Sequence, residues 1–239
     1  MRALAVQPSL VQRACEAIVS EIVAGRLPSG KRLIQDDLAR ALGVSRQPVQ
    51  QALLLLRNHG IVKEAAGRGL IVAPLVATEV RDLYQLRGAM EALAARLAAA
   101  NGGGSLKTQG AALIARGCAA LQRGSLEDQI VADIDFHVML AQASGNALLN
   151  ETMAPHWPKF RRIMAEVLRE GEQGSRRIWD EHAAILEAVV SGDGERSAHL
   201  CEDHLTKASH MVVDRIAARE HKAAQAQEPA VALSAAAAG

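Results

Sequence analysis

The sequence has few aromatic residues and no long run of apolar ones. Phe, Trp and Tyr make up 2% of the 239 residues, whereas 49% are hydrophobic, so aliphatic side chains must form the core. That composition favours packed helices over a large sheet. The length is sufficient for two domains of ordinary size, each with its own core.

Cysteine is also scarce. Cys15, Cys118 and Cys201 are too few and too widely spaced for a disulfide framework or a CxxC site, and we expect buried, reduced thiols. No segment approaches the roughly 18 uninterrupted apolar residues of a membrane span, and the N-terminus lacks the apolar core of a secretion signal. The sequence therefore predicts a cytoplasmic protein without a membrane partner.

Positive charge is concentrated near the N-terminus. Residues 1–75 contain ten Lys and Arg against five Asp and Glu, and the remainder contains 17 against 21. A basic small domain joined to a mildly acidic larger one suits a protein of which only one end approaches a polyanion. Nucleic acid is the first partner that this distribution suggests.

Residues 1–75 have the pattern of a winged helix-turn-helix domain. Apolar residues at helical spacing predict three helices, over residues 10–24, 35–42 and 46–56. Gly43 suits the left-handed end of the second helix, and Ser45 suits the N-cap of the third. Short apolar runs at 61–62 and 70–72, joined through a glycine-bearing turn, predict a small β-hairpin.

Beyond Pro74 every long segment has a helical pattern. Turn residues separate six predicted helices, over residues 78–100, 106–123, 126–143, 146–169, 175–191 and 195–220. The glycine-rich stretch 101–105 is either a loop within one bundle or a domain boundary. We place the boundary near Pro74, which gives a mainly α protein with an all-α bundle over residues 76–222. The Ala-rich run 223–239 has no distinct polar face, and we expect a disordered tail there.

The segment Gly25–Pro74, GRLPSGKRLIQDDLARALGVSRQPVQQALLLLRNHGIVKEAAGRGLIVAP, resembles the N-terminal domain of the GntR family of bacterial regulators. The rest resembles the helical, FCD-type effector domain of its FadR subfamily through LYQLRGAMEALAARLAA, DIDFHVMLAQASGN, HAAILEAV and HLCEDHL. Six helices rather than seven are more similar to the VanR-type branch. The resemblance implies a homodimeric regulator, typically a repressor, which binds a double-stranded DNA operator and releases it when a ligand binds.

The third helix is the one free to enter a major groove. Its first turns carry the polar residues Ser45, Arg46, Gln47 and Gln50, and we expect Arg46 and Gln50 to contact base edges. Members of the family usually have Arg-Glu where this chain has Gln50-Gln51, so the resemblance implies no operator sequence. We expect further phosphate or minor-groove contacts from Arg32, Arg40, Arg57, and Arg68 with Gly69 on the wing. For each of these arginines, the alternative is a solvated charge that contacts no DNA.

Three histidines occupy positions where the helical pattern predicts inward-facing side chains. They are His137, His182 and His204, and Asp133 lies one turn before His137 on the same face. An Asp-x3-His pair with two helical histidines is metal-ligand chemistry, whereas the alternative is three separately hydrogen-bonded core histidines. Many FadR-type effector domains carry the same set, so the resemblance favours a divalent ion held by these four residues, with zinc and nickel as the leading identities.

The first effector helix contains Leu86-Arg87-x3-Glu91, which matches a pattern of the same subfamily. The family typically binds organic acids or regulates genes of their metabolism, and a guanidinium pairs with a carboxylate through two parallel hydrogen bonds. Arg87 is therefore predicted to bind a small carboxylate effector, with an internal salt bridge as the alternative. Weaker candidates for the same pocket are Tyr84, Arg161 and Arg162.

Two other functions use the same predicted site. The metal ion itself could be the signal, which would make the protein a direct metal sensor. A divalent ion with exchangeable water could also hydrolyse a substrate. The attached DNA-binding domain and the lack of an evident general base on a neighbouring helix face count against an enzyme.

Overall fold

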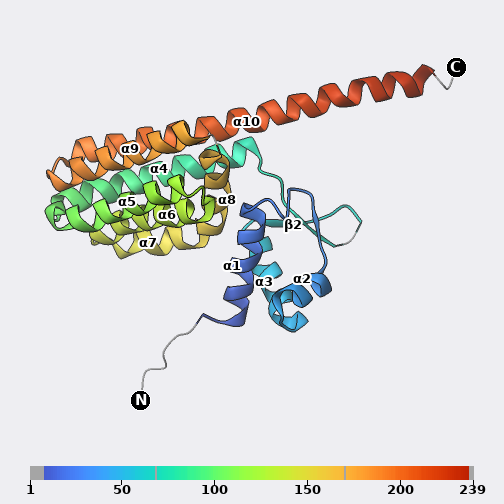
Figure 1. Cartoon of the computed structure of the whole chain (residues 1–239), viewed down its shortest axis with the longest axis horizontal. Coiled ribbons are helices and arrows are strands. Elements are labelled where there is room, and N and C mark those ends of the chain that lie inside the picture. Colours follow the sequence, from blue (N-terminus) through green and yellow to red (C-terminus); the bar gives the residue numbers. More distant parts are fainter. Residues whose placement is uncertain (1–7, 68, 170, 237–239) are drawn as a thin grey trace, which may run out of the picture.

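The computed structural model describes the backbone of residues 8–67, 69–169 and 171–236. Figure 1 shows a helical bundle beside a smaller N-terminal domain, with the last helix running along the bundle and beyond it. The fold is mainly α, with a winged helix-turn-helix and an all-α bundle, as the sequence predicts. Among the described residues, no helix is both long enough and apolar enough to cross a bilayer.

The N-terminal domain combines three helices with a small antiparallel sheet. The helices are α1 (Leu10–Val23), α2 (Gln35–Leu42) and α3 (Arg46–Asn58), and the strands are β1 (Arg32–Leu33), β2 (Val62–Glu64) and β3 (Leu70–Val72). The predicted hairpin is β2–β3, in the sheet order β1-β3-β2. The sequence analysis did not predict β1, because two residues are too few to show an alternating pattern; pairing of Arg32 with Ile71 forms it.

Local signals set the bounds of these helices. Ser9 caps α1 in a reciprocal arrangement with Gln12, which satisfies two backbone donors. Gly43 ends α2 with a φ of 65°, the left-handed conformation predicted for it. Ser45 occupies the N-cap position of α3, but its side chain makes no capping hydrogen bond. The Ser45 hydroxyl is exposed at the start of α3.

The bundle is built from α4 (Ala77–Ala100), α5 (Lys107–Gln122), α6 (Leu126–Ala143), α7 (Ala147–Met153), α8 (Trp157–Leu168), α9 (Glu172–Val190) and α10 (Gly194–Ala236), with 3-10 turns η1 (Gly103–Leu106) and η2 (Ala154–His156). The described bundle thus has seven α-helices rather than the six expected, because the segment 146–169 is divided at Pro155 and Pro158. Proline lacks the amide proton that a continuous helix requires. Helix count therefore gives no support to the VanR-type branch.

The glycine-rich stretch 101–105 is a turn inside the bundle. A methyl group on Gly103 would lie 2.2 Å from the Val189 carbonyl oxygen, so η1 packs directly on α9. The Ala-rich run expected to be disordered from residue 223 instead continues α10 to Ala236, in keeping with the high helix propensity of alanine. Residues 237–239 lie outside the described part of the chain.

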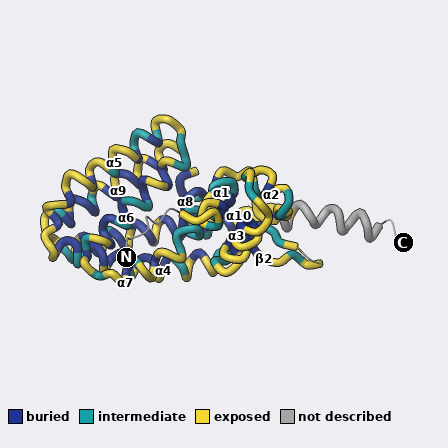
Figure 2. Tube along the Cα trace, turned by 90° about the horizontal axis from the view of Figure 1, so that it is seen from below, coloured by how far each residue is buried: buried dark blue, intermediate teal, exposed yellow. Residues whose placement is uncertain are grey.

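One hydrophobic cluster extends across both domains, and two further clusters lie within the bundle. A single cluster of buried residues includes Ile18 and Val49 from the N-terminal domain and Phe160 and Ile163 from α8. Figure 2 shows buried residues along the inner faces of the bundle helices and exposed ones on their outer faces. Because α8 packs against α1, a displacement of α8 would act directly on the N-terminal domain.

Candidate functional site

The four predicted metal ligands converge from three helices. Asp133 and His137 lie on α6, His182 on α9 and His204 on α10; all four are buried, and their donor atoms lie within 4.8 Å of one another. Nε2 of His182 is 3.2 Å from Nε2 of His137 and 3.4 Å from Oδ1 of Asp133. Three separate core histidines would not need to bring their imidazole nitrogens together in this way.

Two glutamates lie behind the imidazoles, and one of them, Glu181, is hydrogen-bonded to its histidine. Oε2 of Glu91 lies 2.5 Å from Nδ1 of His137, and Oε2 of Glu181 lies 2.7 Å from Nδ1 of His204. A carboxylate on Nδ1 leaves Nε2 for a metal and raises the basicity of the ring. The sequence analysis did not identify Glu181, because it serves a histidine of the neighbouring helix and helical spacing carries no signal of that contact.

Burial and charge set the protonation of this cluster. Burial lowers the pKa of His182 well below its usual value, and the neighbouring His204 and His137 lower it further, so the ring is neutral. Neutral imidazole is the form that binds metals. Burial alone would raise the pKa of Glu91, but the charges of Arg87 and His137 lower it to about 2. Three imidazoles and one carboxylate form a donor set that fits several divalent ions.

A small cavity adjoins two of the four candidate ligands. It measures about 20 Å³ and is lined by Asp133 and His204, by Tyr84 and Arg87 of α4, and by apolar residues of α8 that include Met164. Nε of Arg87 lies 2.6 Å from Oε1 of Glu91, which is the internal salt bridge considered as the alternative. The structure thus brings two predicted effector residues, Tyr84 and Arg87, to the candidate metal site.

Arg87 is nevertheless only partly satisfied. Its second terminal nitrogen is buried without a hydrogen bond among the described residues, and the Asp133 carboxylate is 3.9 Å from it. The Tyr84 hydroxyl lies beside the guanidinium but makes no hydrogen bond to a described residue, and burial raises its pKa to about 12. Both groups can still donate a hydrogen bond to an acceptor.

The other two arginines lie elsewhere. Arg161 does not line the cavity, because its guanidinium is held by Glu127 of α6 and by Ser20 of α1, 3.2 Å away. These contacts join the two domains, and a role of Arg161 in effector binding stays a prediction. Arg162 points into a different pocket, between α8 and the N-terminal domain. The sequence does not show which distant partners the two arginine side chains can reach, and those partners decide where both guanidinium groups lie.

The first turn of α3 is exposed, as a base-reading surface requires. Ser45, Arg46, Gln47 and Gln50 are all exposed. Nε of Arg46 lies 2.5 Å from Oδ1 of Asp36, so an ion pair with α2 currently orients this side chain. To contact a base edge, the Arg46 guanidinium would exchange this exposed ion pair, which is worth little in water, for DNA acceptors.

The candidate phosphate contacts surround this surface. Arg40 pairs with Asp37 at 3.3 Å and Arg57 with Glu64 at 2.8 Å, and all four side chains are exposed. The Arg32 guanidinium lies against the wing, where a methyl group on Gly69 would lie 3.1 Å from it. Gly69, with a φ of 101°, thus makes room for Arg32. Arg68 lies outside the described residues.

Comparisons with known proteins agree with this architecture. The family model "Bacterial regulatory proteins, gntR family" matches residues 10–72, and the model "FCD domain" matches residues 82–207. The solved structure of McbR/YncC from Escherichia coli superposes with a TM-score of 0.75 at 20% identity and covers 88% of this chain and 100% of that one. At that identity the likeness shows a shared fold.

Curated relatives match over most of their length. An HTH-type transcriptional regulator, BphR of Paraburkholderia xenovorans, is 28% identical over 214 residues, which cover 85% of both chains. The Glc operon transcriptional activator of Escherichia coli is 30% identical over 217 residues, which cover 80% of this chain and 84% of the relative. The family and these relatives are transcription regulators rather than enzymes. The chain accordingly belongs to the GntR family of bacterial regulatory proteins and is a DNA-binding transcription regulator with an FCD domain.

Proposed function

We propose that this regulator senses a small organic acid at a pocket that holds a divalent metal ion. The observation that carries the proposal is a buried terminal nitrogen of Arg87 that makes no hydrogen bond to the described residues; Arg87 lines the same cavity as Asp133 and His204. A buried donor without a partner costs about 1–3 kcal/mol, and more when it is charged. The carboxylate of an acid would satisfy this donor and the Tyr84 hydroxyl together.

The ion would be held by Asp133, His137, His182 and His204, and it would supply open coordination positions for a carboxylate oxygen. Glu91 and Glu181 keep two of the imidazoles in the orientation that this requires. Zinc and nickel both suit three nitrogens and one oxygen. Two of the residues that would hold the ion, Asp133 and His204, also line the acid pocket.

The size of the cavity suggests how the acid would act. About 20 Å³ has room for about one water molecule. An acid of several carbon atoms must therefore displace the residues of α8 that close the cavity, such as Met164 and Leu168. The same helix contacts the N-terminal domain through Arg161, which reaches Ser20, and the residue that follows the helix, Arg169, donates to the Val23 carbonyl. Displacement of α8 would then shift the DNA-binding domains.

We further propose that the protein acts as a homodimer, with two α3 helices in successive major grooves, and that the acid releases it from a repressed operator. Relatives include both a Glc operon transcriptional activator and a probable D-xylose utilization operon transcriptional repressor, so family membership leaves the sign of regulation open. Release of DNA follows if displacement of α8 changes the spacing of the two α3 helices.

A direct metal sensor is the second candidate. It is favoured by the same cavity volume of about 20 Å³, because an ion and one water need no further opening. In that case the ion alone would change DNA affinity, since it would draw α6, α9 and α10 together. The hydrolase alternative has no support from the family or from the named relatives.

One titration separates these functions. Operator fragments would first be selected from genomic DNA with the purified protein. Their affinity would then be measured for metal-stripped protein, for protein reloaded with zinc or nickel, and for reloaded protein with a panel of two- to six-carbon carboxylic acids. A coupling of about 1–3 kcal/mol predicts a 5- to 150-fold change in DNA affinity caused by one class of acid in reloaded protein.

The controls sharpen the outcome. Arg87→Met should abolish the acid response, whereas Arg116→Met, which removes an exposed arginine paired with Asp135 on the outer surface, should preserve it. A full response to metal without acid would establish the metal sensor instead. An equal acid response in stripped and reloaded protein would contradict a role for the ion.

A further inference from the structure

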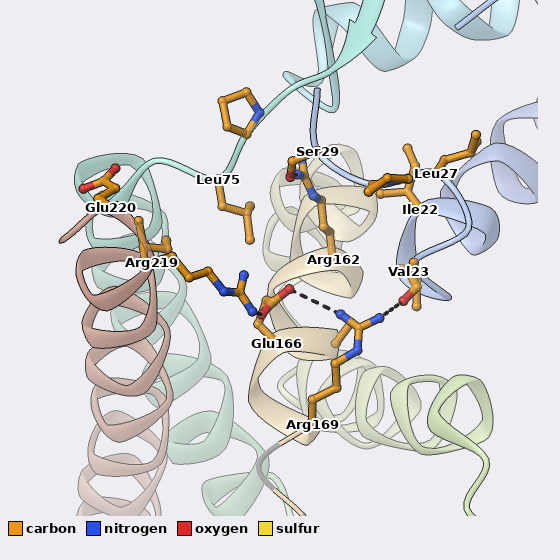
Figure 3. A pocket seen from close by; sticks show the side chains of 15 residues that line it. Ile22, Val23, Leu27, Ser29, Leu75, Arg162, Glu166, Arg169, Arg219 and Glu220 are labelled. Carbon is orange, nitrogen blue, oxygen red and sulfur yellow. Dashed lines mark hydrogen bonds and ion pairs between the residues drawn. The ribbon is translucent and has the colours of Figure 1, made fainter. Parts of the chain in front are cut away.

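A larger pocket lies between the two domains, away from the candidate metal site. It measures about 450 Å³ and is enclosed by the end of α1 and the loop after it, the linker that precedes α4, one face of α8, and α10 (Figure 3). That volume falls within the range of about 300–1,000 Å³ that is typical of small-molecule sites. Both domains contribute walls, so any occupant would contact both.

Arg162 is the polar group that distinguishes this pocket. Its residue is only 7% exposed, although it is an arginine at a pocket wall. Its hydrogen bond goes to the neutral Ser29 hydroxyl, at 2.9 Å, and no described carboxylate lies within ion-pair distance of it. Burial lowers the pKa of Arg162 to about 10, and Glu166 offsets this only in part. A buried guanidinium without a carboxylate is rare unless an anion pairs with it.

The carboxylate nearest to this guanidinium is already engaged. Glu166 pairs with Arg169 at 3.3 Å and with Arg219 at 2.7 Å, while Arg169 also donates to the Val23 carbonyl. Figure 3 shows the pairing of Glu166 with Arg169 on one side of the pocket and Arg162 reaching toward Ser29 on the other. One positive charge of the pocket therefore lacks a counter-charge among the described residues.

Apart from Arg219 and Glu220 of α10, the remaining walls are mostly apolar. Ile22, Leu27, Leu75 and Ile216 face the pocket from four different segments. Inorganic phosphate would leave these walls in contact with water, whereas an anion with a hydrocarbon body would cover them. We propose that the pocket binds a small organic carboxylate with an apolar body, with its carboxylate on Arg162 and its body between the two domains.

Such a ligand would fix how the DNA-binding domain sits on the bundle. This second site is independent of the acid pocket proposed at the metal centre, because no residue of one lines the other. Metal-centre variants can therefore separate the two proposals. Octanoate is a suitable probe, with octanol as its neutral analogue and inorganic phosphate as an anion without an apolar body.

Isothermal titration calorimetry on the full-length protein tests the assignment. Octanoate should bind saturably, and octanol and phosphate at least about 10-fold more weakly. Arg162→Met should weaken octanoate binding by about 10- to 100-fold, the range expected when a charged hydrogen-bond partner is lost. The control Arg176→Met, which removes an exposed arginine paired with Glu172, and His182→Ala, at the metal centre, should both bind octanoate as the unchanged protein does.

Hydrogen exchange locates the ligand. Octanoate should slow amide exchange in residues 22–29 and 162–169 together, and Leu75→Trp, which fills the pocket and keeps Arg162, should abolish both the protection and the heat of binding. This second variant tests the pocket even if Arg162→Met fails to fold. Unchanged binding in both pocket variants, loss of binding in His182→Ala, or phosphate binding as tightly as octanoate would overturn the proposal.

Discussion

Replacing Arg87 with methionine separates the structural role of this residue from its proposed role in ligand binding. Arg87 and Glu91 are each 2% exposed and lie 2.6 Å apart. The substitution leaves Glu91 buried with His137 as its nearest charge partner, and removes the cation closest to Asp133. Breaking a buried pair by removing one partner costs about 3–5 kcal/mol. We expect a loss of stability of that size in metal-free protein.

The double variant Arg87→Met/Glu91→Gln removes both charges. It keeps an amide oxygen that can accept from Nδ1 of His137, so the imidazole retains a partner. Replacement of both members of a buried pair by neutral groups is often close to neutral, so the double variant should recover about half or more of the stability lost by the single one. Binding of acid to metal-loaded protein should remain absent in both, because neither has the guanidinium.

Urea-induced unfolding measures the free energy of unfolding of each variant. Circular dichroism reports the helices, and fluorescence of Trp157 and Trp179, both in the bundle, reports the effector domain. Calorimetry with the panel of carboxylic acids measures the affinity of each variant for the acid. A cost below about 1 kcal/mol for the single variant would refute the buried-pair argument. Acid binding that survives in the double variant would refute the assignment of Arg87 to the carboxylate.

Three further predictions follow from other parts of the structure. Glu181→Gln should weaken zinc binding by about 10- to 100-fold, measured by competition with a chelator, because His204 loses a charged partner. Gly117→Ala should lower the free energy of unfolding in urea by about 1–3 kcal/mol, since its methyl group would lie 2.2 Å from a tryptophan ring of α9. The control Gly88→Ala, also in a helix but with open space for a methyl group, should not lower it. Burial raises the pKa of the Cys201 thiol well above its usual value, so iodoacetamide at pH 8 should alkylate Cys201 only after unfolding; labelling of Cys201 in native protein would contradict this.

The sequence alone predicts what depends on neighbours along the chain. The bounds of α2 and the left-handed glycine at its end follow from a 3.6-residue period and from the freedom of Gly43 at positive φ. The inward orientation of the four candidate ligands was also predictable, because Asp133 and His137 share a helix face and two other helices each carry an inward histidine. The resemblance to GntR regulators supplied the DNA-binding function, which the family models and relatives confirm.

Predictions from the sequence were less accurate where a proline or a distant side chain determines the local structure. The prediction of one continuous helix over 146–169 was wrong. The spacing of apolar residues carries no information about the amide proton that proline lacks and that a continuous helix requires. All three cysteines were expected to be buried, yet Cys15 and Cys118 are only half-buried, since helical periodicity does not show how closely another helix approaches. Strand β1 exists only because β3 lies beside it.

Residue identity and helical spacing determined which side chains face inward, and hence that the chain carries a candidate metal site and a DNA-reading helix. Only the tertiary structure decided that Glu181 supports His204, that Arg161 joins the domains, and that Arg162 lies buried beside an apolar pocket. The physical reason is the distance along the chain over which each kind of interaction acts. Backbone periodicity acts over a few residues, whereas ion pairs and cavities depend on which distant side chains reach the same place once the helices have packed.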